Sequence, residues 1–351
     1  MRNAGQRIRV MMLATGVAVA AAAHVRAQAA PPAGEAPAKM EVTDEVGRRV
    51  WIPATVRRIV SLAPNLTEMI YALGAQDRLV GVTDFCDYPP EARQKTRIGG
   101  AVNPNIEQIV ALKPHLVLAQ AFTLNRRETV EELERLGLAV YAANSRSVEG
   151  ILDSTRRIAA LIGASEQGES LTASLREKLD ELKRRLNRRA PKRVLFVVWA
   201  DPLVTIGRET FLADALRLAG AESVVDVAQD WPRISLEEVV RLQPQFLVFA
   251  SSHSESIRAT VEELSARPGW RGLEAIRKRR VAVVSEAINR PAPRLIEALG
   301  ELARQLHPEA FGEKSEKRKV KIENRPLQPD DCAFAIFYFP FSIFASERPV
   351  R

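Results

Sequence analysis

The sequence predicts an α/β fold of two lobes, each a parallel sheet covered by helices, with one long helix between them. Three observations predict it. Short apolar runs alternate with helical periods, a block of 15 residues recurs 130 positions later, and a leucine-striped helix separates the two copies. Alternation of strands and helices is typical of parallel sheets with helices on their faces. An offset this long indicates duplicated domains, because the units of solenoid proteins repeat every 20 to 50 residues, roughly.

The first lobe is predicted from the region that follows residue 40. Residues 58–62 form an apolar run of strand length, and residues 66–73 have helical spacing that stops at Gly74. Residues 79–82 form a second short apolar run. The region therefore predicts a strand, a helix and a second strand in succession.

The internal repeat predicts the second lobe. Residues 105–119 recur as residues 235–249, with a polar residue, an apolar helical stretch, a proline and a buried strand in the same places. Residues 193–199 repeat the first strand of the chain, and Gly220 repeats the helix stop. Both lobes are therefore expected to share one plan.

The connection between the lobes is predicted to be helical, from residues 147–163 and 166–189. The second stretch carries an apolar stripe at helical spacing, formed by Leu171, Leu175, Leu179, Leu182 and Leu186. At 1.5 Å per residue this helix would run about 35 Å. A helix of that length restrains the lobes more than a Gly- or Ser-rich linker would.

The N-terminus indicates a secreted protein. Three arginines among the first nine residues precede the uncharged apolar residues 10–23, and Ala27-Gln28-Ala29 fits the small-x-small cleavage pattern. The sequence predicts a signal peptide over residues 1–29, with an uncleaved anchor as the alternative. Residues 30–40 are rich in Pro, Ala and Gly and are expected to form a flexible leader.

The remaining domain boundaries follow from these features. We expect an N-terminal lobe over residues 41–146, connecting helices over 147–190, and a C-terminal lobe over 191–312. Residues 313–351 break from this composition, because five of the twelve Phe of the chain fall in 14 of their residues. This tail is expected to lie outside the fold. A read-through extension and a membrane-surface or partner-binding segment are its two interpretations.

The formal charge of +8 is concentrated at the ends of the chain. Residues 1–30 hold four Arg and no acid, and residues 313–351 hold eight basic and six acidic side chains, which leaves +2 for the residues between them. A nucleic-acid-binding domain usually carries a concentrated basic surface. The sequence therefore predicts no nucleic-acid partner.

Two motifs in the first lobe carry a resemblance to a known family. They are Cys86-Asp87-Tyr88-Pro89-Pro90 and the run Gly-Gly-Ala-Val-Asn-Pro-Asn-Ile-Glu over residues 99–107. With the two lobes and the connecting helix, over residues 57 to about 308, they resemble the helical-backbone substrate-binding proteins of ABC importers, and within them the periplasmic cobalamin-binding branch. The resemblance implies two Rossmann-like lobes with a ligand between them, and an importer permease with its ATPase as partner. It further implies a periplasmic monomer without catalytic activity or a resident cofactor, whose transported ligand is cobalamin or a related corrinoid.

Glu107 and Glu237 occupy the same position in the two repeats. Each lies two residues after a good N-cap residue, Asn105 or Ser235, and the residue that follows it can complete a capping box. Neither glutamate is needed for the cap. One interpretation is that both complement the helix dipole. The resemblance implies the other, that they bind arginines of the permease when the loaded protein docks.

Ligand contacts are expected from loops at the carboxyl ends of the strands, where open parallel sheets bind their ligands. The candidates are Phe85, Tyr88, Ala101, Trp199, Trp231, Glu286 and Arg290. The resemblance matches four of them to positions that line the corrinoid pocket, namely Phe85, Trp231, Glu286 and Arg290. Ala101 is a departure, because the best-known cobalamin binder carries a tryptophan there. Tyr88 either contacts the ligand or anchors its own turn.

Two other functions are compatible with a secreted α/β chain. A ferric siderophore or haem is the alternative ligand within the same family. A secreted α/β enzyme is a more distant alternative, and it would need a nucleophile with its base, or a metal site. The chain has four His, one of them in the predicted signal peptide, so a histidine site for zinc or manganese is not expected. The sequence therefore predicts neither an enzyme nor a metal site.

Overall fold

The computed structural model describes residues 38–121, 124–250, 265–266 and 268–312. All of them belong to one of its two units, Pro37–Arg351. The predicted signal peptide, most of the leader and the predicted tail lie outside the described residues, so the domain boundaries drawn from the sequence stay predictions. Among the helices of the described part, none has the length and apolar character that a membrane crossing requires.

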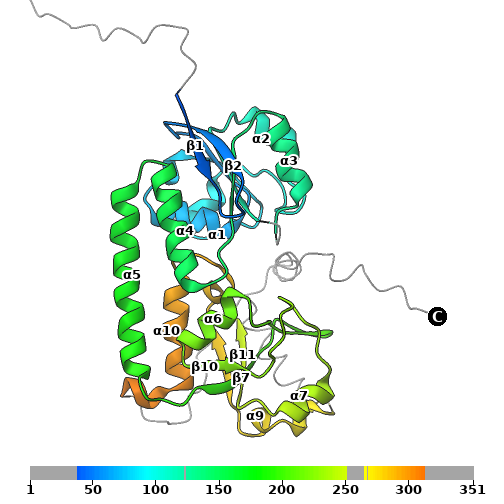
Figure 1. The fold of residues 1–351 in the computed structure, drawn as a ribbon. Helices are drawn as coiled ribbons and strands as arrows, with labels where there is room; N and C mark the ends of the chain where they lie inside the picture. Colours follow the sequence, from blue (N-terminus) through cyan, green and yellow to red (C-terminus); the bar gives the residue numbers. More distant parts are fainter. Residues whose placement is uncertain (1–37, 122–123, 251–264, 267, 313–351) are drawn as a thin grey trace, which may run out of the picture. The chain divides into compact units, whose positions relative to one another are not determined.

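The first lobe, drawn in blue and cyan in Figure 1, is built on a parallel sheet of four strands in the order β4-β3-β5-β6. The strands are β3 (Ile59–Ser61), β4 (Leu79–Val82), β5 (Leu116–Gln120) and β6 (Val140–Ala143). The helices are α1 (Pro64–Ala72), α2 (Ile106–Ala111) and α3 (Arg127–Arg135), with 3-10 turns η1 (Gln76–Arg78) and η2 (Pro90–Gln94). The strands and the first helix confirm the apolar runs predicted for this lobe.

The second lobe has a parallel sheet in the order β10-β7-β11-β12. The strands are β7 (Lys192–Phe196), β10 (Ala221–Ser223), β11 (Phe246–Ala250) and β12 (Val281–Val284). The helices are α6 (Phe211–Leu218), α7 (Leu236–Leu242), α9 (Glu274–Arg277) and α10 (Leu295–Leu306), with 3-10 turns η4 (Trp270–Gly272), η5 (Glu286–Asn289) and η6 (Pro308–Phe311). In both lobes the strand order is second, first, third, fourth along the chain. The duplication inferred from the sequence is therefore a duplication of topology.

The repeat also holds at the level of single residues. Lys113 and Gln243 both adopt a left-handed backbone, with φ of 45° and 42°, directly before the proline of each repeat. In each lobe an arginine at the start of the first strand, directly before β3 or within β7, donates a hydrogen bond to the carbonyl at the end of the repeat helix. Arg58 Nη2 binds the Leu112 oxygen at 2.6 Å, and Arg193 Nη2 binds the Leu242 oxygen at 2.7 Å.

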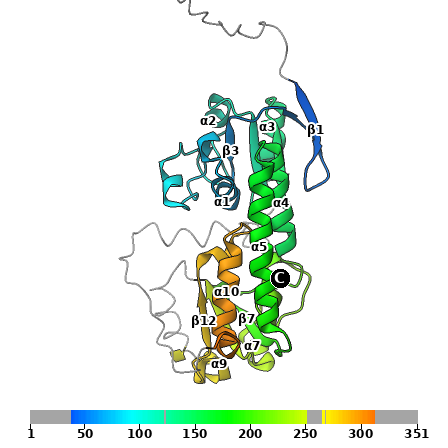
Figure 2. The ribbon, with the colours of Figure 1, turned by 90° about the vertical axis from the view of Figure 1, so that its left-hand side faces the viewer.

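The two connecting helices are α4 (Val148–Leu161) and α5 (Ser165–Leu186). The 22 residues of α5 correspond to about 33 Å of helix. α5 packs against α4 and against α10 of the second lobe (Figure 2), and Lys178 lies 3.7 Å from Glu297 of α10. The four later leucines of the predicted stripe are buried, whereas Leu171 is half-buried. The long connecting helix is therefore confirmed.

Two local features differ from the prediction. The described part of the chain opens with an antiparallel hairpin, β1 (Lys39–Thr43) and β2 (Arg49–Pro53), which was not expected and which leaves Trp51 57% exposed. The strand predicted over residues 193–199 ends at Phe196. Trp199 and Ala200 instead form the short strand β8 and pair with β9 (Leu203–Val204), so the side chain of Trp199 belongs to a separate two-stranded ribbon.

Candidate functional site

The strand order places a potential binding edge in each lobe. The direction in which successive strands are added to the sheet reverses next to the first strand of each sheet. Ligands of open α/β sheets bind at the carboxyl ends of the strands where this reversal occurs. In the first lobe this point lies between β3 and β5, where Asn65 Nδ2 donates to Gln120 Oε1 at 2.8 Å. In the second lobe it lies between β7 and β11, and Trp199 follows β7 there.

Five charged side chains from both lobes form a cluster. The inter-lobe charge cluster consists of Glu68 on α1, Asp87 in the loop after β4, and Glu286, Arg290 and Arg294 near the end of the second lobe. Arg290 Nη1 donates to Glu68 Oε1 at 2.7 Å and its Nη2 to Asp87 Oδ1 at 2.8 Å. Arg294 donates to both carboxylate oxygens of Glu68, at 3.1 and 3.0 Å. Glu286 lies 3.5 Å from Arg290 and 3.3 Å from Arg294.

The centre of this cluster is withdrawn from solvent. The side chains of Arg290 and Glu68 are 2% and 3% exposed, and that of Arg294 is 17% exposed. Burial alone would lower the pKa of Arg294, but the hydrogen bond and the charge of Glu68, together with Glu286, raise it above its ordinary value. Removing one partner of a buried ion pair is strongly destabilising, because it leaves an uncompensated buried charge. The cluster therefore ties the end of the second lobe to α1 of the first.

Tyr88 is attached to the same cluster. The guanidinium carbon of Arg294 lies 3.6 Å from the centre of the Tyr88 ring, which makes a cation–π contact. Tyr88 as a whole is 39% exposed. Asn65, also from the first lobe, is 3.5 Å from the carbonyl oxygen of Pro291. The structure thus gives Tyr88 an anchoring partner and leaves part of its surface exposed, so both interpretations made from the sequence stay open.

The structure brings together three of the predicted ligand residues, Tyr88, Glu286 and Arg290, through this cluster. Phe85 is half-buried and lies beside Gly100, and Ala101 is buried with its carbonyl oxygen accepting a hydrogen bond from Asn125 Nδ2 at 2.8 Å.

Trp199 and Trp231 lie outside the cluster. Both are half-buried. Trp199 Nε1 donates to the Asp201 oxygen at 2.7 Å, and Trp231 packs against the main hydrophobic core. These positions leave the ligand role of all seven residues a prediction.

Glu107 and Glu237 are exposed at the second helical positions of α2 and α7. As predicted, each helix is capped by the preceding polar residue: Asn105 Oδ1 accepts from the Gln108 amide at 2.9 Å, and Ser235 Oγ accepts from the Glu238 amide at 3.2 Å.

The reciprocal half of the predicted capping box is wrong in both lobes. In the first lobe the Asn105 amide donates to the Ile98 oxygen at 2.8 Å instead of to Gln108. In the second lobe the carboxylate of Glu238 pairs with Arg241 at 2.5 Å instead of returning to the cap, because an arginine three residues on lies on the same helix face. Among the described residues, neither Glu107 nor Glu237 has an ion pair or a side-chain hydrogen bond. Both carboxylates are therefore available to a partner.

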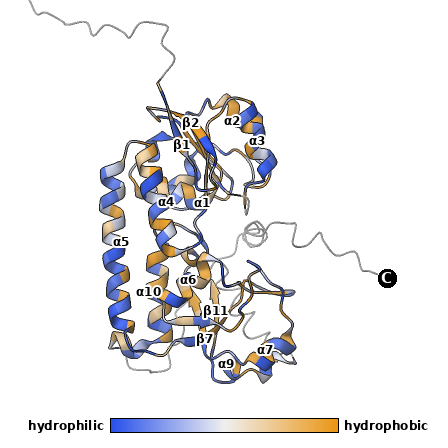
Figure 3. Ribbon diagram, in the orientation of Figure 1, coloured by the Kyte–Doolittle hydropathy of each residue, from blue (hydrophilic) through white to orange (hydrophobic). Residues whose placement is uncertain are grey.

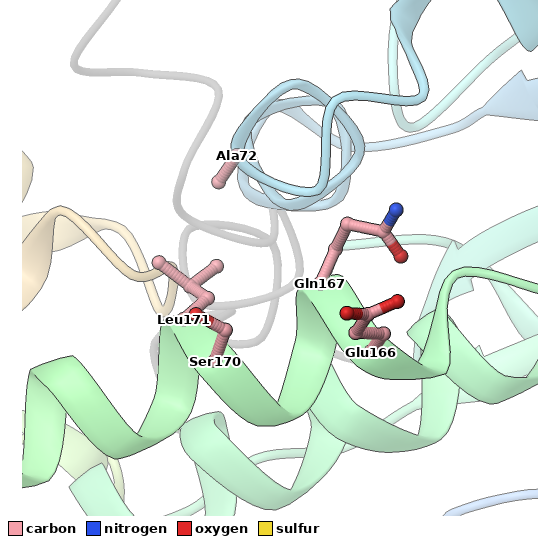
Figure 4. A pocket seen from close by; sticks show the side chains of 5 residues that line it. All are labelled: Ala72, Glu166, Gln167, Ser170 and Leu171. Atoms are coloured by element: carbon pink, nitrogen blue, oxygen red, sulfur yellow. The ribbon is translucent and has the colours of Figure 1, made fainter.

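A pocket of about 460 Å³ lies away from these residues, where the end of α1 meets the start of α5 (Figure 4). It is lined by Ala72, Glu166, Gln167, Ser170 and Leu171. None of the predicted ligand residues borders it. It is open and shallow in character, and we assign it no ligand.

Glu68 and Arg294 were not among the site residues predicted from the sequence. A signal for Glu68 exists: it is the one charged residue of α1, where seven residues from Pro64 to Ile70 are buried. A charged side chain on a buried helix requires a partner. For Arg294 the sequence offers no such signal, because arginines are frequent throughout the chain.

Comparison with known proteins agrees with this architecture. The family model described as periplasmic binding protein matches residues 59–287. An uncharacterised ABC transporter substrate-binding lipoprotein of Bacillus subtilis is 30% identical over 279 residues, which cover 78% of this chain and 87% of that protein.

Two solved structures are similar in fold and sequence. The periplasmic vitamin B12-binding protein of Vibrio cholerae has a TM-score of 0.63 at 28% identity, covering 74% of this chain and 99% of the other. The periplasmic haem-binding protein of Roseiflexus sp. RS-1, in its apo form, has a TM-score of 0.64 at 26% identity, covering 73% and 99%. With two lobes of the same topology, one connecting helix and a family match over most of the described residues, this chain belongs to the periplasmic binding proteins, the substrate-binding proteins of ABC importers.

Proposed function

We propose that the protein works in the periplasm, captures cobalamin or a related corrinoid between its lobes, and delivers it to the permease and ATPase of an ABC importer. The observation that carries the proposal is the pair Glu107 and Glu237. Each is exposed at the same position of its repeat, and neither has an ion pair among the described residues. Two such carboxylates, one in each lobe, can orient the protein on a cationic partner through charge-assisted hydrogen bonds.

The charge of the inter-lobe cluster favours a corrinoid over haem. Three carboxylates and two guanidiniums give it a formal charge of −1, and both guanidiniums already bind carboxylates. A haem presents two propionates, which call for cationic partners, whereas a corrinoid presents mainly uncharged amides. A ligand without carboxylates therefore avoids competing with Glu68, Asp87 and Glu286 for the arginines.

Haem remains the second candidate, on the likeness to the haem-binding protein of Roseiflexus sp. RS-1. The visible absorption spectrum distinguishes the ligands directly, because cobalamin, haem and a ferric siderophore each carry their own chromophore. The protein is incubated with each ligand, passed through a desalting column, and examined for the retained spectrum; calorimetry then gives the stoichiometry. We expect retention of cyanocobalamin at one molecule per chain.

A variant pair tests where the ligand binds. Trp231→Ala is expected to weaken binding at least about tenfold, as loss of a buried aromatic contact does, whereas Trp51→Ala in the exposed hairpin should leave it unchanged. Retention of haem or siderophore without cobalamin would transfer the proposal to that ligand. Retention of none of the three would contradict solute capture of this class.

A further inference from the structure

Two strongly basic segments of the second lobe are not used by the proposed function. Residues 183–193 contain seven Lys or Arg and no acid, and residues 271–280 contain five Lys or Arg with Glu274 as their one acid. The small net charge of the folded body hides this concentration. The C-terminal half of α5, where the first segment begins, is correspondingly hydrophilic (Figure 3).

The parallel sheet brings the two segments to one edge. The first segment leads into β7 and the second into β12, and both strands are hydrogen-bonded to β11, which lies between them. The Gln245 amide donates to the Arg193 oxygen at 2.7 Å, and the Leu247 amide donates to the Arg280 oxygen at 3.1 Å. Since neighbouring strands lie about 4.8 Å apart, the segments begin their strands about 10 Å from one another. Both therefore lie at the amino edge of the sheet.

Part of this charge is already neutralised within the protein. Lys183, Arg184 and Arg185 pair with acids of their own helix, and Lys278 and Arg280 lie beside Glu274. Six other arginines of the two segments are exposed, and in the part of the chain that the structure describes they have no carboxylate partner. Arg271 on η4 lies apart from the strands, whereas the other five lie in β7 or no more than four residues before β7 or β12. We call these five the basic edge: Arg188, Arg189, Arg193, Arg277 and Arg279.

We propose that the basic edge binds an anionic phospholipid surface. All five side chains are arginines, whose planar guanidinium matches the oxygens of a phosphate group. They are spread along a sheet edge, which suits an extended layer of phosphates better than a single ion. The spacing of the two segments is close to the Debye length of about 8 Å at physiological salt, so their charges act together. Because the protein is predicted to be exported, it works beside a membrane. The phospholipid headgroups of that membrane are an extended layer of phosphates.

The orientation of α7 separates this surface from the docking carboxylate. α7 ends at the basic edge, where Arg193 binds the Leu242 oxygen at 2.7 Å, and its first turn, with Glu237, lies about 10 Å further toward the other edge. When the basic edge faces lipid, Glu237 faces away from it. Lipid binding and permease docking would then be alternative states of the protein, and lipid binding should leave the ligand accessible.

The test compares two variants of equal net charge by sedimentation with vesicles of phosphatidylcholine alone, or mixed with an equal part of phosphatidylglycerol. The edge variant replaces all five members of the basic edge by Gln. The control replaces five exposed cations of the first lobe by Gln, at Arg49, Arg58, Arg93, Lys113 and Arg135. Each variant then loses one arginine that binds a helix-end carbonyl, Arg193 or Arg58. Both are made in the full chain, so any hydrophobic contribution of the N-terminus is common to them.

We expect the edge variant to bind the phosphatidylglycerol vesicles at least about tenfold more weakly than the control, since each Lys or Arg near such a surface contributes appreciably. The difference should disappear in phosphatidylcholine vesicles and at high salt, with equal melting temperatures. Equal losses in the two variants would overturn the proposal, because net charge alone would then explain binding. So would displacement of the vesicles by duplex DNA or inorganic phosphate at the same phosphate concentration.

Discussion

The two lobes share a topology but not a surface chemistry. Strand order, the left-handed residue before each proline, the polar N-cap and the arginine that binds the end of the repeat helix are the same in both. These features all satisfy backbone groups or turns, which a duplicated fold has to keep. Side chains that face outward differ, and the comparison therefore shows which parts of the repeat belong to the fold and which are available for separate roles.

The inter-lobe charge cluster illustrates the divergence. Its carboxylates Glu68 and Asp87 come from the first lobe, and both arginines come from the second. The cluster is asymmetric in charge although the lobes are alike in fold. By contrast Glu107 and Glu237 are alike in both position and exposure, and unlike Arg58 and Arg193 they bind no group of their own lobe among the described residues.

Charge reversal at the shared glutamates is expected to have the largest effect. Glu107→Arg combined with Glu237→Arg would place like charges against the permease, which costs several kcal/mol, so ligand uptake in a reconstituted system should fall at least about a hundredfold. Ligand binding should be unaffected, since neither carboxylate has a partner within the described chain. Stability should fall only slightly, by about 1 kcal/mol for each cation placed at a helix N-terminus.

The single reversals sharpen the comparison between lobes. Equal losses for Glu107→Arg and Glu237→Arg would show that the lobes contribute equally to docking. Glu238→Gln is the matched control, because it removes a neighbouring carboxylate that is already paired with Arg241. Normal uptake by the double reversal would mean that the two glutamates only complement their helix dipoles.

Glu68→Gln tests the asymmetric part of the comparison. It removes the carboxylate that binds both arginines and leaves Arg290 and Arg294 partly uncompensated in a buried site. We expect a loss of about 3 kcal/mol in the free energy of unfolding, measured by urea denaturation. Glu181→Gln, which breaks only exposed pairs with Arg184 and Arg185, should leave the free energy of unfolding nearly unchanged. Equal costs for the two variants would show that the cluster is not a strong inter-lobe tie.

The smallest effect is expected at the N-caps, where the lobes should behave alike. Asn105→Ala and Ser235→Ala each remove one side-chain acceptor for a backbone amide, at Gln108 and Glu238. Each should lower the unfolding free energy by about 1 kcal/mol. A much larger cost in one lobe would indicate that its helix end depends on more than the cap. Thermal or chemical unfolding of the two single variants side by side provides the measurement.

Most of the fold could be predicted because the signals are local. Residues 79–82, the helix stop at Gly74 and the long helix α5 follow from apolar spacing and breakers within a few residues. The hairpin β1–β2 and the break after Phe196 were missed. In both cases the decisive partner is an antiparallel neighbour across a turn, and Trp199 pairs with Val204 although its own sequence continues the apolar run of β7.

The candidate site was less accessible to sequence reasoning. Glu286 and Arg290 could be found as positions, but their partner Glu68 lies 222 residues from Arg290 along the chain. No periodicity or local motif joins residues at that separation, and only the packing of the folded chain decides which charges are neutralised by one another. A sequence pattern can therefore predict which charged residues belong to such a site, but not which of them form ion pairs with one another.

That separation has a consequence for the order of events during synthesis. Chains are made N-terminus first, at about 5 to 20 residues per second, so roughly 10 to 45 seconds pass between the appearance of Glu68 and that of Arg290. Throughout this interval Glu68 has neither of its arginine partners. The first lobe must therefore keep this carboxylate hydrated at the place where it is later buried. Whatever assists this chain while it is being made encounters an acidic surface there that the finished protein no longer displays.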